Sequence, residues 1–218
     1  MRMNLRGILL FFFQFTLTLA PLSLFGRHII GGEITYKYLS TTGTSNRYEI
    51  TMKIYRDCLG GGAGFDNPAI VAIYKGSMTN NSFVTKLLFG NPTTKPLVAV
   101  PPPCVSSLPN VCVEEAVYTK IIDLPILDDQ SYFIVYQRCC RNQTISNIIS
   151  PGDIGATYTI ELTADAQKLQ NSSLTFNNFP PIIICNNIPF EFDHSATDID
   201  GDQIFYSLCS PLDGGGRN

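Results

Sequence analysis

The sequence predicts an all-β fold in which short strands form a β-sandwich. Apolar and polar residues alternate with a period of two in many short stretches, and this alternation places one face of each strand in a core. The 218 residues include 17 glycines and 14 prolines, which is typical of a chain with many turns. Only 15% of the residues are charged, which argues against disorder driven by charge. Many short strands joined by such turns favour a sandwich.

The clearest strand covers residues 48–54, which read Tyr-Glu-Ile-Thr-Met-Lys-Ile. Residues 34–38 alternate in the same way, and the polar residues 40–46 between the two stretches predict a hairpin loop. The only helical pattern is short and covers residues 163–169. The same criteria predict further strands over residues 69–74, 83–89, 113–124, 132–136 and 156–162.

A domain boundary is predicted between residues 171 and 179, where a loop-like stretch gives way to a new apolar run. We expect residues 27–175 to form a disulfide-linked β-sandwich domain. Residues 176–218 are expected to form a partial immunoglobulin- or cadherin-like β module. Only about forty residues remain there, against about 100 in a complete immunoglobulin-like sandwich. We therefore expect this module to be truncated.

The N-terminal residues 1–26 are predicted to be a signal peptide. Arg2 and Arg6 supply the positive start, residues 8–20 form an apolar core, and Gly26 offers a small residue for cleavage. The alternative is a membrane anchor, but the apolar core is short for a helix that spans a bilayer. We therefore expect an exported chain with no membrane span after signal cleavage.

The seven cysteines are expected to form disulfides, because an exported chain folds in an oxidising compartment. Metal binding is the weaker alternative, since no Cys-x-x-Cys pair exists. Two pairings are suggested by position, one closing a proline-rich loop between Cys104 and Cys112 and one joining Cys185 to Cys209. Cys139 and Cys140 are expected to serve different partners, because neighbours in a strand point to opposite faces. The odd number leaves one thiol over; the candidates are Cys58, Cys104, Cys112, Cys139, Cys140, Cys185 and Cys209.

Residues 198–202 read Asp-Ile-Asp-Gly-Asp and resemble a calcium loop. They do not fit the EF-hand pattern, which requires glycine at position six and glutamate at position twelve. Alternating carboxylates in an extended segment can still present several oxygens to Ca²⁺, and Asp193 could add another. The alternative is a solvated acidic turn.

The sequence contains no motif that supports an enzyme or a nucleic-acid-binding protein. Residues 27–32 are similar to the start of an activated trypsin-like protease, but no Gly-Asp-Ser-Gly-Gly nucleophile loop follows. Residues 60–64 are glycine-rich without the Gly-Lys-Ser/Thr that grips phosphate, and Asp128 and Asp129 form a turn signal rather than a catalytic pair. The chain has no cluster of lysine or arginine and a formal net charge of −3, so no nucleic-acid partner is expected.

Several stretches together resemble one family. The segments are residues 31–36, 54–58, 65–68, 109–115, 135–142, 176–181 and 192–198, and the double-cysteine stretch is the most specific of them. They resemble the N-terminal region of large surface proteins of Bacteroidota, the gliding-motility-associated, PKD-domain-containing proteins exported by type IX secretion. The resemblance implies a β-rich bacterial cell-surface protein for adhesion rather than catalysis. It also implies that Asp198, Asp200 and Asp202 are calcium ligands, by similarity to cadherin-like modules.

Such surface proteins usually end in a C-terminal domain that the secretion machinery recognises, whereas this chain ends in the middle of the predicted second module. We expect a fragment of a longer protein or a short relative. The expected function is a non-enzymatic adhesin-type module that binds surface glycans or other surface proteins. Two rivals stay open: a carbohydrate-binding module that uses some of the ten tyrosines, and a secreted hydrolase, for which no carboxylate pair with supporting spacing is found.

Overall fold

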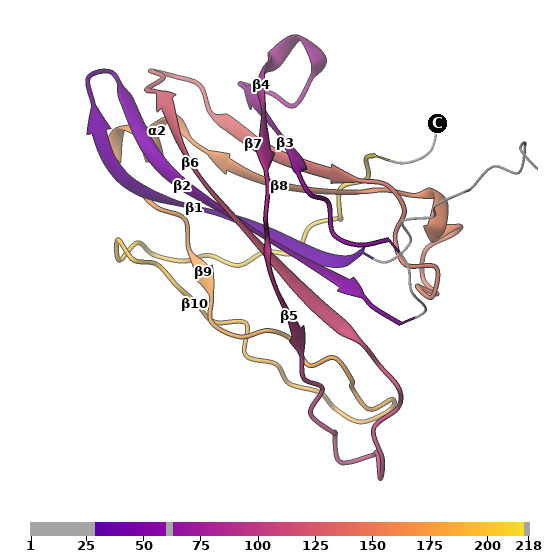
Figure 1. Cartoon of the computed structure of the whole chain (residues 1–218). Coiled ribbons are helices and arrows are strands. Elements are labelled where there is room, and N and C mark those ends of the chain that lie inside the picture. The colour runs from indigo at the N-terminus through magenta and orange to yellow at the C-terminus, as the bar shows by residue number, and fades with distance from the viewer. Residues whose placement is uncertain (1–28, 60–62, 216–218) are drawn as a thin grey trace, which may run out of the picture.

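The computed structural model describes residues 29–59 and 63–215, so the predicted signal peptide lies outside the described residues. Two four-stranded antiparallel sheets dominate the fold (Figure 1). This architecture confirms the all-β, sandwich-like fold. One sheet has the order β1 (Ile29–Thr42), β2 (Ser45–Asp57), β6 (Val113–Pro125) and β5 (Thr93–Leu97). The other has the order β4 (Phe83–Phe89), β3 (Ala69–Lys75), β7 (Tyr132–Arg138) and β8 (Ala156–Leu162).

The core lies between the two sheets and follows the alternation in the sequence. Every second residue of β2 faces inward, and its four central inward residues are at most 1% exposed: Tyr48, Ile50, Met52 and Ile54. Ile73 of β3 and Ile134 of β7 face them from the other sheet and are fully buried. Burial of each such side chain contributes about 1.5–3 kcal/mol to folding, so these strands carry most of the hydrophobic stabilisation.

Two adjoining strands close one flank of the sandwich. β4 pairs with β3 in one sheet, and β5 pairs with β6 in the other, although only residues 90–92 separate them. Figure 1 shows the two strands almost in line, so the chain passes from one sheet to the other with a slight bend. The alternation did not predict β5, because Thr93–Leu97 has the sequence Thr-Thr-Lys-Pro-Leu and mostly exposed residues.

The first hairpin is tighter than predicted. Strand pairing continues to Thr42 and resumes at Ser45, so the loop expected over residues 40–46 shrinks to two residues. Gly43 there has φ +60°, a left-handed conformation that glycine adopts without steric cost. The predicted helical stretch forms α2 (Ala164–Leu169), and Thr163 caps it by accepting a hydrogen bond from the backbone N–H of Ala166.

The loop before β3 ties the two sheets together at one end of the sandwich. The Asp66 carboxylate accepts a hydrogen bond from the Tyr136 hydroxyl at 2.7 Å and forms an ion pair with Arg138. The backbone carbonyl of Asp66 accepts another from the Tyr118 hydroxyl, also at 2.7 Å. Tyr118 belongs to β6 and Tyr136 to β7, so one loop residue is anchored to both sheets.

The C-terminal residues 176–215 have little regular structure. Their only strand pairing joins β9 (Thr175–Phe176) to β10 (Ala196–Thr197), and the chain runs outside the sheet that contains β1 (Figure 1). Near its end the backbone N–H of Thr157 on β8 donates to the carbonyl of Leu212 at 3.1 Å. Two short 3-10 turns complete the described elements: η1 (Asn80–Ser82) and η2 (Pro151–Asp153). Across the described ranges, no helix has the length and apolar character needed to cross a membrane.

Candidate functional site: a pocket beneath the C-terminal segment

Six of the seven cysteines are paired, but not as the sequence suggested. Cys58, just after β2, joins Cys112, just before β6, and Cys104 joins Cys185. The predicted Cys104–Cys112 and Cys185–Cys209 pairs are therefore wrong, because the two ends of the proline-rich loop reach different parts of the fold. Cys209 carries a free thiol in an exposed position.

Cys139 and Cys140 pair with each other, which corrects the prediction that they serve different partners. That prediction assumed a continuing strand, in which neighbouring side chains alternate. β7 ends at Arg138, and Cys140 has φ +77°, so the alternation no longer applies at these two residues.

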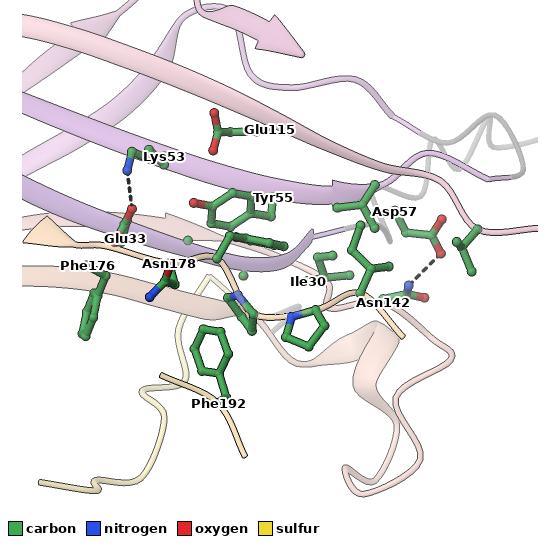
Figure 2. A pocket seen from close by; sticks show the side chains of 18 of the residues that line it. Ile30, Glu33, Lys53, Tyr55, Asp57, Glu115, Asn142, Phe176, Asn178 and Phe192 are labelled. Carbon is green, nitrogen blue, oxygen red and sulfur yellow. Dashed lines mark hydrogen bonds and ion pairs between the residues drawn. The ribbon is translucent and has the colours of Figure 1, made fainter. Parts of the chain in front are cut away.

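The main pocket lies between the outer face of the β1–β2–β6 sheet and the C-terminal segment (Figure 2). Its volume is about 780 Å³, enough for a small molecule or a few side chains. Residues of the sheet form the floor and residues 176–182 form the roof. The pocket is lined by residues that include Ile30, Gly31, Glu33, Lys53, Tyr55, Asp57, Glu115, Asn142, Phe176, Asn177, Asn178, Phe179, Pro180, Pro181, Phe192 and His194.

Glycine and an aromatic pair shape the floor. Gly31 lies opposite Tyr55 in the strand register, and a Cβ at Gly31 would meet the Tyr55 ring at 3.6 Å. The absent side chain leaves the Tyr55 ring open toward the roof, where the Phe179 ring packs against it with 4.7 Å between ring centroids. The strand register and Gly31 thus create an aromatic floor.

Charged side chains flank Tyr55 on the sheet. Lys53 donates to the Glu33 carboxylate at 2.7 Å, and Lys95 forms an ion pair with Glu115 at 3.1 Å. Glu115 is only 7% exposed and lies directly across from Tyr55 in the sheet. Burial, together with the nearby Glu33 and Glu115 carboxylates, raises the pKa of Tyr55 well above its usual range. Tyr55 therefore keeps its proton at neutral pH and offers a neutral ring and hydroxyl.

A carboxylate and an amide meet at the other end of the pocket. Asp57 Oδ2 accepts a hydrogen bond from Asn142 Nδ2 at 2.9 Å, drawn in Figure 2, and Asp57 Oδ1 accepts one from the backbone N–H of Leu59 at 2.8 Å. Asn142 is 7% exposed, and its Oδ1 accepts a hydrogen bond from the backbone N–H of Thr144. Asn142 follows the paired cysteines, so its position depends on the turn that they form.

The roof is held in place by one disulfide and a small hydrogen-bond network. The Cys104–Cys185 disulfide fixes its far end to the loop after β5. Asn178 Nδ2 donates to the Asp193 carboxylate at 3.0 Å, and the backbone N–H of Asn177 donates to the carbonyl of Ser195 at 3.0 Å. Hydrogen bonds, first from the backbone N–H of Ser195, lower the pKa of Asp193 and keep it ionised.

The predicted calcium loop lies away from this pocket and uses its carboxylates within the fold. Asp198 Oδ1 accepts hydrogen bonds from the backbone N–H groups of Asp200 and Asp202. Asp200 accepts one from the backbone N–H of Ser172 at 2.6 Å, and Asp202 accepts one from Asn171. In residues 29–59 and 63–215, no three His, Cys, Asp or Glu side chains come together as a metal site. Calcium binding by this loop stays a prediction.

The other residues that the sequence suggested for a site, the Asp128–Asp129 pair and most of the tyrosines, do not line the pocket. Asp128 and Asp129 are exposed in the loop after β6. Most tyrosines serve the sandwich core, and Tyr55 is the one that lines the pocket. The sequence analysis missed the roof, although its Phe-Pro-Pro motif at residues 179–181 was visible as the start of a new apolar run. Alternation gave no reason to place that run over the outer face of the first sheet.

Compared with models of known protein families, with curated proteins and with solved structures, the chain finds no match. The pocket and the disulfides are therefore the features of the molecule that bear on its function.

Proposed function

We propose that this chain is a non-enzymatic, extracellular binding module of a bacterial cell-surface protein of the adhesin type. The observation that carries the proposal is the pocket formed where the C-terminal segment is fastened over the outer face of a rigid sheet. Its aromatic floor and apolar roof offer a contact surface that would be costly to expose without a binding role. A hydrogen-bonded sandwich holds that surface in one shape, which reduces the ordering cost of binding.

The disulfides support an extracellular location. Three disulfides within one chain are typical of proteins that fold in an oxidising compartment. Two of them connect parts of the chain that are 54 and 81 residues apart, so they brace the fold as a whole. Such bracing suits a protein that is displayed outside the cell, where reducing and chaperone systems are absent.

Adhesion can be tested with microspheres coated with the secreted chain and passed over bacterial cells under controlled flow. We expect retention above that of albumin-coated spheres, and a loss of about fivefold or more when Tyr55→Ala removes the aromatic floor. Phe205→Ala is the matched control, because Phe205 is an aromatic residue that is 81% exposed and does not line the pocket. Retention equal to that of albumin would contradict the adhesin proposal.

A carbohydrate-binding module is the second candidate function. The observation in its favour is the group of aromatic rings in the pocket, where Tyr55, Phe179 and Phe192 could stack on sugar rings. A glycan array probed with the wild-type chain and with Tyr55→Ala tests this candidate. Binding to a defined set of glycans that disappears in the variant would favour it over protein binding.

A further inference from the structure

The formal charge of the pocket is negative. Three carboxylates line it, from Glu33, Asp57 and Glu115, against the single ammonium of Lys53 and the imidazole of His194. Lys53 already donates to Glu33 at 2.7 Å, so it is not free to attract a ligand anion. The pocket therefore opposes anionic ligands and favours cationic ones.

The three side-chain amides of the pocket already donate hydrogen bonds within the fold. Asn142 Nδ2 donates to Asp57, Asn178 Nδ2 donates to Asp193, and Asn177 Nδ2 donates to the hydroxyl of Ser195 at 3.1 Å. A sugar hydroxyl needs donors as well as acceptors around it. The carboxylates are the strongest hydrogen-bonding groups that remain, and they only accept, so the pocket suits a ligand that brings its own donors.

Two of the carboxylates have capacity left for such a ligand. Asp57 accepts from two neutral donors, and no described residue forms an ion pair with it. Glu115 is largely buried, and its one ionic partner, Lys95, has a side chain that is 63% exposed. An exposed lysine is flexible and well solvated, so it only weakly neutralises the carboxylate.

The aromatic rings add to the preference for a cation. The face of an aromatic ring carries partial negative charge and attracts an ammonium or guanidinium group within about 6 Å. Tyr55 and Phe179 already meet in the middle of the pocket, with Glu115 on the sheet side of Tyr55 and Asp57 at the pocket end (Figure 2). The prolines of the roof and Ile30 of the floor provide apolar surface for neighbouring side chains of the ligand.

We propose that this pocket binds a peptide segment that carries a lysine or arginine side chain flanked by apolar residues. The cationic group lies beside the Tyr55 and Phe179 rings, between Asp57 and Glu115, and the flanking residues pack on Ile30 and the roof. The inference rests on the proposed binding function and names the chemistry of its partner. A protein at a cell surface would present such a segment in a loop or an extended terminus.

The test uses the full secreted chain and an array of immobilised random decapeptides, with a glycan array in parallel. We expect the bound peptides to be enriched in lysine or arginine next to aromatic or aliphatic residues. For the best of them, replacing arginine with the neutral isostere citrulline should weaken binding about tenfold or more. The combined variant Asp57→Asn with Glu115→Gln should cause a similar loss and retain the thermal transition of the folded protein.

Two further variants separate the inference from general effects of charge or folding. Lys95→Ala removes the exposed competitor for Glu115, so it should strengthen binding of the arginine peptide about threefold. Asp128→Asn with Asp129→Asn removes the same number of carboxylates from an exposed loop outside the pocket and should leave affinity nearly unchanged.

Several results would overturn the inference. They are peptides without basic enrichment, equal binding of the citrulline peptide, an undiminished affinity of the Asp57→Asn, Glu115→Gln variant, or glycan binding lost in that variant. The microsphere assay keeps the two proposals apart. If adhesion persists in the Asp57→Asn, Glu115→Gln variant, the basic-peptide ligand is refuted and the adhesin function stands. If the chain binds basic peptides but does not retain microspheres on cells, the adhesin function is refuted and the ligand stands.

Discussion

The sandwich and the C-terminal segment are stabilised in different ways although both are rich in apolar residues. The sandwich buries its apolar residues between two sheets, and the central positions of β2 have almost no exposed surface. In residues 176–215 no residue is buried, and Leu208 is fully exposed. That segment is held by one long-range disulfide and by hydrogen bonds of carboxylates. An apolar run becomes a core strand only when a matching apolar face is available to it.

The largest expected effect contrasts an apolar residue from each region. Ile50→Ala leaves a cavity in the core and should lower the free energy of unfolding by about 2–5 kcal/mol. Leu208→Ala removes a side chain that contacts mainly water, so its effect should stay within about 0.5 kcal/mol. Urea denaturation followed by circular dichroism measures both. Equal effects would mean that the C-terminal segment contributes to the core after all.

The second prediction removes the covalent link between the two regions. Cys104→Ser with Cys185→Ser should cost about 2–4 kcal/mol, because the unfolded chain regains the freedom of a long loop. Under native conditions, amide hydrogen exchange should rise in residues 176–194 and stay slow in β2.

The neighbouring cysteines supply the control for this experiment. Cys139→Ser with Cys140→Ser also removes two cysteines and one disulfide, but that bond closes no long loop. It should leave exchange in residues 176–194 unchanged. Faster exchange throughout the sandwich in the Cys104→Ser, Cys185→Ser variant would show that the two regions form one cooperative unit.

The third prediction uses alkaline pH to weaken the sandwich. Burial raises the pKa of Tyr36 and of Tyr118 to about 12, above the usual value of 10. Below pH 10 these tyrosines are protonated in both the folded and the unfolded state, so they do not change the free energy of unfolding with pH. Between pH 10 and 12 only the unfolded state releases these protons, so each tyrosine costs about 1.4 kcal/mol for each pH unit. Denaturation at pH 9 and 10.5 tests the slope, which Tyr118→Phe should reduce.

The smallest expected effect concerns the aspartate loop of the C-terminal segment. Extracellular calcium modules bind with dissociation constants of about 10⁻⁴–10⁻³ M, so 10 mM calcium over a 1 mM site would stabilise the folded state by about 1.4 kcal/mol. For a chain of this size that corresponds to a rise of about 3–6 °C in the unfolding midpoint. Asp198→Asn should abolish this rise. If the wild-type chain unfolds at the same temperature with calcium as with a chelator, the loop does not bind calcium.

The strands that sequence reasoning placed well are those with the regular alternation that a half-buried sheet requires. Predicted ranges 69–74, 83–89 and 156–162 correspond closely to β3, β4 and β8. β5 was missed because its place in the sheet depends on β6 rather than on its own residues. The disulfide partners and the pocket roof were missed for a similar reason, since both depend on where distant segments meet. Asp57 and Asn142, 85 residues apart, illustrate this limit.

The two long-range disulfides determine how the protein would carry a mechanical load. From β2 the shortest covalent route leads through Cys58 to Cys112, back over eight residues to Cys104, and across to Cys185. The strands β3 to β8 lie off this route, so tension between the two ends of the described chain could not unravel them without breaking a disulfide. Only the first hairpin, the short stretch between Cys104 and Cys112, and the chain after Cys185 could extend under tension. A tether built this way would therefore lengthen little before its disulfides carried the load.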